Sequence, residues 1–187
     1  GVVDAITAED IGKFADRNIA EALSRLVGVT TNRDNGESTS VTIRGLGPEF
    51  NLVTLNGRSM PTVPPLWVGG RSFDFGDVSS SGVAAVEVYK SENAILPTGG
   101  LGATINMVTT KPIDGKNGGG ISVRAMHHSS VEKGDDYTPE VDLVFLRNGE
   151  IGDAKWGFSV SGSHHVMHNR ESGTNEITWL PSPIENN

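Results

Sequence analysis

The stretch "SVTIRGLGPEFNLVTLNGRSMP", residues 40–61, contains two short apolar segments joined by a glycine-rich link. In "VTIR", Val41 and Ile43 alternate with polar residues, which is the pattern of a half-buried β-strand. "NLVTLNGR" predicts a second strand that ends at the turn dipeptide Asn56-Gly57. The link "RGLGPEFN" either cradles a phosphate or joins two strands of a small sheet.

Neither glycine cluster of the chain fits a nucleotide site. No Gly-Lys-Ser/Thr follows "RGLGPEFN", as a phosphate-binding loop requires. "GGLGATIN", residues 99–106, leads into a segment with a strand pattern, whereas a phosphate-binding turn leads into a helix. We therefore interpret the glycines as residues that permit tight turns and close backbone approach.

The composition limits the classes of function. The chain has 187 residues, 36% of them apolar, and this length suits one domain with or without part of another. The net charge of −8 argues against broad contact with nucleic acid, whose binding proteins usually carry a basic face. Because there is no cysteine, disulfides and thiolate metal sites are excluded. No apolar run reaches the roughly 18 residues of a membrane-spanning helix.

The first 112 residues predict an α+β domain, a small mixed sheet flanked by short helices. Residues 6–29 have a helical pattern that predicts two short helices, or one helix broken near Asp16. Thr7 and Asn18 are the expected N-caps, and Gly28 is the expected C-cap glycine. "VAAVEVYK" and "GATINMVTT" predict a third and a fourth strand.

Residues 113–187 have a different character and predict about three antiparallel strands. Apolar residues alternate with polar or small ones in "GISVRAMHHSS", "PEVDLVFLRN" and "KWGFSVSGSHHVMH". In the last of these, Trp156, Phe158 and Val160 fall on one face. Strands of roughly ten residues with one apolar face fit the wall of an outer-membrane β-barrel. Three soluble antiparallel strands with one buried face would show the same pattern.

An ordered series of short motifs runs through residues 5–112. The series consists of Ile43-Arg44-Gly45, Asn56-Gly57-Arg58, Val86-Glu87-Val88 with Lys90, the glycine cluster at 99–103, and Ile105-Asn106 with Thr109. Together with the helical segment before it, the series resembles the plug domain of TonB-dependent outer-membrane receptors. The C-terminal part resembles the first strands of their barrel, so the fold implied is a plug followed by a truncated barrel.

The resemblance implies a gate for active transport across the bacterial outer membrane. The plug would control uptake of a scarce or bulky nutrient, an oligosaccharide or a metal chelate, with energy from the inner membrane. The expected partners are the substrate, the chain's own barrel and a TonB-type energy transducer, whose N-terminal recognition segment is not recognisable here. The family's commoner Arg-Gly-Pro after "VEV" is replaced by Tyr89-Lys90-Ser91, a form similar to a branch associated with oligosaccharide uptake. No cofactor is implied.

Two groups of residues are the candidate sites. By resemblance, Arg44 pairs with barrel glutamates and helps to hold the plug, with Lys90 in the place of the second basic residue; alternatively, Arg44 is a surface residue of an edge strand. The loop at residues 61–76 is the candidate for ligand contact, because it combines stacking faces with hydrogen-bonding groups. Its candidate residues are Trp67, Arg71, Phe73 and Asp74. The alternative is a loop that packs its aromatic side chains against the barrel wall.

We expect neither a metal site nor an enzyme. His164 and His168 share a face of the predicted strand but lie about 13 Å apart at 3.3 Å per residue, too far for one metal. No serine stands in a nucleophile-elbow sequence. The rival interpretation is a soluble periplasmic or extracellular ligand-binding module, and the gene beyond Asn187 distinguishes the two. We also expect the chain to self-associate, because its barrel strands would lack neighbours.

Overall fold

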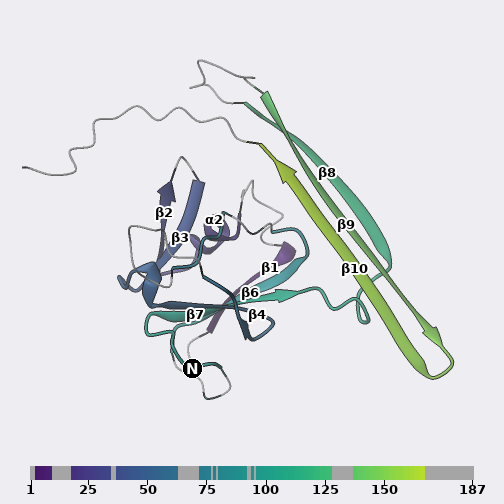
Figure 1. The fold of residues 1–187 in the computed structure, drawn as a ribbon, viewed down its shortest axis with the longest axis horizontal. Helices are drawn as coiled ribbons and strands as arrows, with labels where there is room; N and C mark the ends of the chain where they lie inside the picture. The colour runs from purple at the N-terminus through teal and green to yellow at the C-terminus, as the bar shows by residue number, and fades with distance from the viewer. Residues whose placement is uncertain are drawn as a thin grey trace, which may run out of the picture.

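The computed structural model describes most of the chain: residues 3–9, 18–34, 37–62, 72–76, 78, 80–91, 94, 96–127 and 137–166. An N-terminal domain built on a five-stranded and a two-stranded sheet is followed by a separate three-stranded sheet that stands beside it (Figure 1). In the part of the chain described here, no helix is long and apolar enough to cross a membrane.

The central sheet of the N-terminal domain is mixed, with strand order β1-β6-β7-β4-β5. Its strands are β1 (Val3–Thr7), β4 (Asn51–Leu55), β5 (Arg58–Ser59), β6 (Val83–Tyr89) and β7 (Ala103–Thr109). β4 and β7 are parallel, and the other neighbours are antiparallel. The middle strand β7 buries five consecutive residues, from Ala103 to Met107, so both of its faces are covered.

A hairpin and a short helix complete the core. The hairpin consists of β2 (Val29–Asp34) and β3 (Glu37–Ile43), and the helix is α2 (Ile19–Leu23). Asn18 is the N-cap of α2: its side chain accepts the N–H of Glu21 at 3.1 Å and donates to the carbonyl of Ser38 at 2.8 Å. The cap therefore joins the start of the helix to the hairpin. The largest fully buried apolar side chains are Phe75, Ile19, Leu23, Ile43, Ile105, Met107, Val41, Val86 and Val88.

The glycine-rich link joins strands of two different sheets, which corrects the expectation that both strands share one sheet. Arg44 and Gly45 adopt positive φ angles of 53° and 77° and turn the chain away from β3. A short 3-10 helix, η1 (Pro48–Phe50), then leads into β4. By contrast, the turn at Asn56 and Gly57 is a tight hairpin as predicted, with φ angles of 51° and 78° that suit a type I′ turn.

The helical pattern at the N-terminus extends further than the helices do. α2 ends at Leu23 with Ser24 as its C-cap, and Gly28 (φ 75°) lies in the following turn rather than at the C-cap. Thr7 is the last residue of β1, a strand that the sequence did not predict, and Ala8 and Glu9 after it are helical. Residues 10–17 of the first predicted helix lie outside the described residues.

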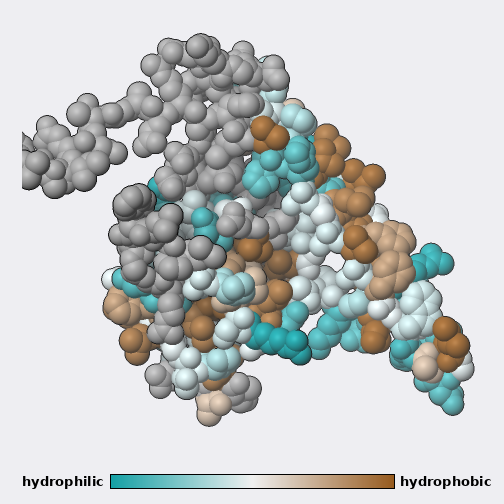
Figure 2. All heavy atoms as spheres, in the orientation of Figure 1, coloured by the Kyte–Doolittle hydropathy of each residue, from teal (hydrophilic) through white to brown (hydrophobic). Residues whose placement is uncertain are grey.

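The C-terminal sheet consists of β8 (Gly118–His127), β9 (Tyr137–Ile151) and β10 (Ala154–His165), in the order β10-β9-β8. β9 and β10 are joined by a tight turn in which Gly152 has a φ of 61°. The register pairs Ile121 with Leu143 and Val160 with Phe145, so apolar side chains line up on one face. Figure 2 shows brown, hydrophobic side chains gathered along this outer sheet.

The link between β7 and β8 contains the expected domain boundary, between residues 112 and 113. The fold class predicted from the sequence, a small mixed sheet with short helices followed by antiparallel strands, is confirmed. The candidate residues lie in the N-terminal domain, and side chains of the C-terminal sheet contact this domain.

Candidate functional site

Arg44 reaches across the N-terminal domain to the glycine cluster. Its backbone N–H donates to the carbonyl of Gly28 at 2.9 Å, and its Nη2 donates to the carbonyl of Gly102 at 2.8 Å. The N–H of Gly102 in turn donates to the carbonyl of Phe50 at 2.9 Å. Arg44 thus ties the end of β3 to the loop before β7, a role that does not need a carboxylate partner.

Lys90 is engaged inside the same domain. Its ammonium group forms an ion pair with the carboxylate of Asp4 on β1 and donates to the carbonyl of Val27 at 2.6 Å. The Lys90 side chain is only 11% exposed, whereas that of Asp4 is 35% exposed. The predicted pairing of Lys90 and Arg44 with barrel glutamates stays a prediction, but Lys90 already has a carboxylate partner.

Both basic residues line one cavity of about 490 Å³. The rest of its lining consists of Tyr89, Ser91, Ala94, residues 96–101 and Thr104. The resemblance groups Arg44 and Lys90 as residues that pair with the barrel, and the motifs give no sign of this shared cavity. The glycine cluster shapes it: a Cβ on Gly100 would lie 2.6 Å from the carbonyl oxygen of Ala103.

Glu87 on β6 accepts hydrogen bonds from two polar side chains of the central sheet. Its Oε2 accepts the side-chain amide of Asn106 at 3.0 Å and the hydroxyl of Tyr89 at 2.9 Å. The hydrogen bond to Glu87, followed by partial burial and the negative charge of that carboxylate, raises the pKa of Tyr89 above its usual value of 10.0. The motifs Val86-Glu87-Val88 and Ile105-Asn106 therefore meet in one hydrogen-bonded group, a role that the sequence did not predict.

The predicted ligand loop is described only at its end. Trp67 and Arg71 lie outside the described residues. Phe73 is 8% exposed and packs edge-on against Phe75 with 4.9 Å between the ring centroids, so it belongs to the core of the domain. Asp74 is exposed, and its Oδ1 accepts the N–H of Gly76 at 2.8 Å. Of the described candidates, Asp74 alone has a side chain that is open to a ligand.

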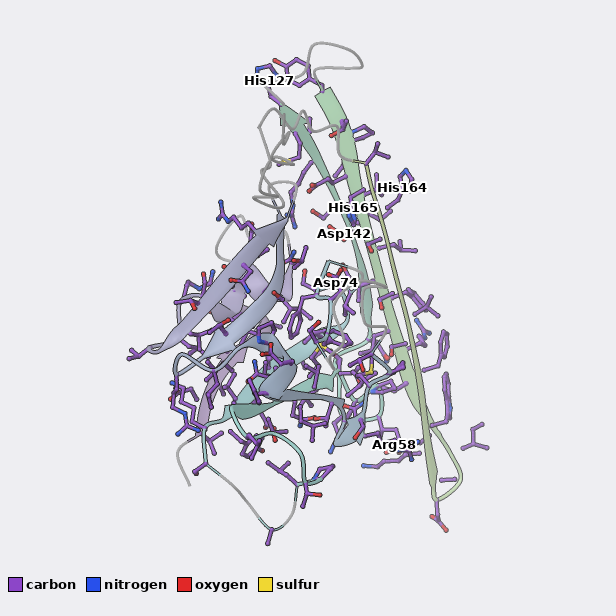
Figure 3. All side chains as sticks on the ribbon, turned by 60° about the vertical axis from the view of Figure 1, so that its left-hand side comes forward. Arg58, Asp74, His127, Asp142, His164 and His165 are labelled. Atoms are coloured by element: carbon purple, nitrogen blue, oxygen red, sulfur yellow. The ribbon has the colours of Figure 1, made fainter. Side chains whose placement is uncertain are left out.

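The polar face of the C-terminal sheet contacts the N-terminal domain. The hydroxyl of Ser81 donates to Oδ1 of Asp142 on β9 at 2.8 Å. Figure 3 shows Asp142 and His165 on the side of the sheet that faces the N-terminal domain and His164 on the other side, as the alternation requires. Sequence reasoning missed Ser81 and Asp142. The only signal was a charged residue on the polar face of a strand whose other face is apolar.

Hydrogen bonds hold the link before β8 against the C-terminal sheet. The side-chain amide of Asn148 donates to the carbonyls of Pro112 and Gly115 at 2.7 and 2.6 Å. Leu146, 8% exposed, is so close to Gly115 that a Cβ there would lie 2.7 Å from its methyl group. The three-stranded sheet is therefore joined to the N-terminal domain both through the chain itself and through side chains.

Comparison with known proteins gives the family. A family model described as TonB-dependent Receptor Plug Domain matches residues 1–104, more than half of the 187-residue chain. Ferric enterobactin receptor PirA of Pseudomonas aeruginosa is 31% identical over 124 residues, which is 60% of this chain and 17% of that protein. A probable TonB-dependent siderophore receptor, PirA of Acinetobacter baumannii, is 30% identical over 121 residues, or 58% and 16% of the two chains. The chain thus spans less than a fifth of the length of the curated relatives it matches.

Solved structures agree in fold. The siderophore receptor PirA from Acinetobacter baumannii has a TM-score of 0.66 at 22% identity and covers 87% of this chain and 24% of its own. The unliganded ferric citrate transporter FecA also gives 0.66 at 22% identity, over 88% and 25% of the two chains. These likenesses extend past the family match into the C-terminal sheet, which is therefore the start of a barrel wall. The chain belongs to the TonB-dependent receptor plug family, whose members are proteins of the bacterial outer membrane.

Proposed function

We propose that this chain gates the uptake of a ferric siderophore or a similar metal chelate through an outer-membrane transporter. The N-terminal domain is called the plug below, and β8, β9 and β10 are called the wall. One observation carries the proposal: a plug-family domain packs against the polar face of a sheet whose apolar face points outward. Such a sheet suits a barrel with lipid on one side and a plug in its lumen.

The relatives favour a metal chelate as the substrate class. Their names refer to ferric enterobactin and siderophores, and nothing in those names supports the oligosaccharide that Tyr89-Lys90-Ser91 suggested. Two of these residues form contacts inside the plug: Tyr89 donates a hydrogen bond to Glu87, and Lys90 forms an ion pair with Asp4. The departure from the family's commoner motif therefore has a structural explanation that does not involve the substrate.

The connections between the wall strands indicate which end faces the cell exterior. In outer-membrane barrels the short turns lie on the periplasmic side and the longer loops outside. The turn between β9 and β10, at residues 152–153, is short, and the connection between β8 and β9 is longer. In Figure 1 the β2–β3 hairpin extends toward the end of the sheet at which β8 ends and β9 begins. This end of the plug would meet the substrate first.

The mechanism follows from this orientation. Substrate binds on the outer side of the plug, and Asp74, with Trp67 and Arg71, contributes to its contacts. A TonB-type transducer then pulls on the plug from the periplasmic side, and the plug shifts or partly unfolds to open a path. Barrel glutamates pair with Arg44 beside the cavity of about 490 Å³ and hold the plug in the resting state.

Uptake by the full-length receptor tests the proposal. Cells that express it under iron limitation are expected to accumulate iron from a ferric catecholate, and a protonophore should stop accumulation without stopping binding. Ferric citrate and a maltooligosaccharide serve as alternative substrates. Recovery of the protein in the soluble periplasmic fraction, with ligand binding but no uptake, would establish the rival interpretation of a binding module.

A further inference from the structure

We propose that the hydrogen bond between Ser81 and Asp142 is a releasable contact between plug and wall, and that it must open before substrate can pass. This inference rests on the proposed gating function and adds the place where the gate opens. Ser81 and Asp142 are 61 residues apart and belong to different domains, and 2.8 Å separates Oγ of Ser81 from Oδ1 of Asp142.

On the plug side, the contact is fixed to the central sheet. Ser81 lies in a turn that leads into β6, with the N–H of Val83 donating to the carbonyl of Ser80 at 3.2 Å. The carbonyl of Gly82 accepts the N–H of Thr110, at the end of β7, also at 3.2 Å. Any shift of β6 and β7 relative to the wall therefore moves Ser81 as well.

Gly82 shows how closely the two parts approach. Its φ is 85°, a conformation that suits glycine, and a Cβ at this position would lie 2.6 Å from Oγ of Ser161 on β10. The turn thus touches two strands of the wall, β9 through Asp142 and β10 through Ser161. A Cβ at residue 82 would also lie 3.1 Å from Cβ of Ser161, so a side chain there would crowd the approach of the plug to the wall.

On the wall side, Asp142 is held by a basic neighbour. Nη2 of Arg124 on β8 lies 3.7 Å from Oδ2 of Asp142, and Nη1 lies 3.9 Å from Oε2 of Glu140. Each oxygen of Asp142 therefore faces a different partner, one in the plug and one in the wall. When the plug moves away, the Asp142 carboxylate keeps Arg124 as a cationic neighbour, which it shares with Glu140.

The contact stands between two hollows. A cavity of about 310 Å³ is lined by Ser81, Ser122 and Val144 among others, and a much smaller one of about 30 Å³ by Ser163 and His165 among others. Ser80, Arg124 and Asp142 line both cavities. Opening the Ser81–Asp142 contact would join the two spaces into one passage along the wall. The bonds of Asn148 to the link need not break for this, because that link continues directly into β8.

Crosslinking of the full-length receptor tests the inference. The chain has no cysteine, so Ser81→Cys with Asp142→Cys can be joined by a short bis-thiosulfonate reagent in a receptor without other cysteines. The control pairs Glu150→Cys with Lys155→Cys, exposed neighbours across β9 and β10 that lie outside the proposed contact, and it joins wall to wall. We expect the plug-to-wall crosslink to lower ferric-siderophore uptake by at least about tenfold with little change in binding, because a gating step is blocked. The control crosslink should leave both unchanged, and reductant should restore uptake.

Each other outcome overturns a distinct statement. A plug-to-wall crosslink that forms and leaves uptake at the wild-type rate shows that this contact need not open. Failure of the crosslink to form, while the control forms, shows that the two residues are not neighbours in the membrane. If the uncrosslinked receptor binds and transports no ferric chelate, the proposed function fails rather than the location of the gate.

Discussion

The side-chain oxygen of Asn106 accepts the backbone N–H of Gly57 at 2.9 Å, so a residue of β7 holds the turn that ends β4. The same oxygen accepts the hydroxyl of Thr54 at 2.9 Å, and the amide nitrogen donates to Glu87. Asparagine suits this position because its amide is both donor and acceptor. Three motifs that are separate in the sequence therefore meet at one side chain.

The first prediction concerns this amide. Asn106→Ala should lower the free energy of unfolding by about 2 kcal/mol, because the N–H of Gly57 and the hydroxyl of Thr54 lose a buried acceptor. Urea unfolding followed by far-UV circular dichroism measures the change. Asn32→Ala is the matched control, since Asn32 bonds to Ser40 at the exposed surface. Equal losses of unfolding free energy in the two variants would show that the hydrogen bonds of Asn106 stabilise the fold no more than those of a surface asparagine.

These contacts mark the limit of what the sequence predicts. The alternation at Val41 and Ile43 and the Asn56-Gly57 turn are local patterns, and the structure agrees with both. The partner of Lys90 is 86 residues away in the sequence, and nothing near Lys90 or Asp4 points to the other. Local periodicity specifies which face a residue occupies, but it does not specify which distant side chain that face will meet.

The strands that the sequence did not predict lack a strong local pattern. β1, β2 and the two-residue β5 are short, carry little apolar alternation of their own, and pair with β6, β3 and β4. Their stability comes from these partners rather than from their own apolar alternation. The three wall strands, by contrast, show a long alternation in the sequence and were predicted.

The second prediction separates Lys90 from the pairing role that the resemblance implies. Lys90→Met should lower stability by about 1–2 kcal/mol, between the values for exposed and buried ion pairs, because Asp4 is partly exposed. Hydrogen exchange should show the loss first at residues 3–7, where β1 pairs with β6. A double-mutant cycle with Asp4→Asn isolates the pair. No coupling between the two substitutions would favour a barrel glutamate as the true partner of Lys90.

The third prediction is a pH dependence. The pKa of Tyr89 is raised by Glu87, so the neutral phenol is favoured in the folded state. This stabilisation is complete below pH 10 and is lost as the pH rises from 10 through the folded-state pKa. Absorbance at 295 nm reads the titration, with Tyr137→Phe used to remove the second of the two tyrosines. Glu87→Gln should bring the pKa of Tyr89 back down toward 10; an unchanged titration would remove Glu87 as the cause.

The fourth prediction distinguishes packing from ligand contact in the 61–76 loop. Phe73→Ala should destabilise the plug by about 3–4 kcal/mol, since it removes a buried aromatic ring that packs on Phe75. Asp74→Ala should change stability by less than about 0.5 kcal/mol, as expected for an exposed position. If Asp74 contacts the substrate, its substitution weakens ligand binding while the unfolding midpoint stays in place. Loss of stability without loss of binding at Asp74 would assign it to the Gly76 turn alone.

The fifth prediction concerns the isolated 187-residue chain in water. Its wall strands expose a row of large apolar side chains: Ile121 is 72% exposed, Val123 68% and Val160 54%. β8 and β10 are also the two edges of their sheet, with backbone groups that can pair with another chain. Both features favour association, so we expect a dimer or a larger assembly in light scattering. Residues 1–111 alone, which lack these strands, should form a monomer.

Detergent distinguishes the two causes of association. Micelles cover an apolar face and leave backbone edges free to pair, so dissociation in detergent indicates that Trp156, Phe158 and Val160 drive assembly. Persistence in detergent indicates strand pairing between copies at β8 or β10. The plug-facing side is not available for either, because Ser81 and Asn148 already connect it to the plug and to the link. A monodisperse monomer of the full chain in water would mean that the wall strands hide their apolar face against their own plug, and the lipid-facing assignment would then be wrong.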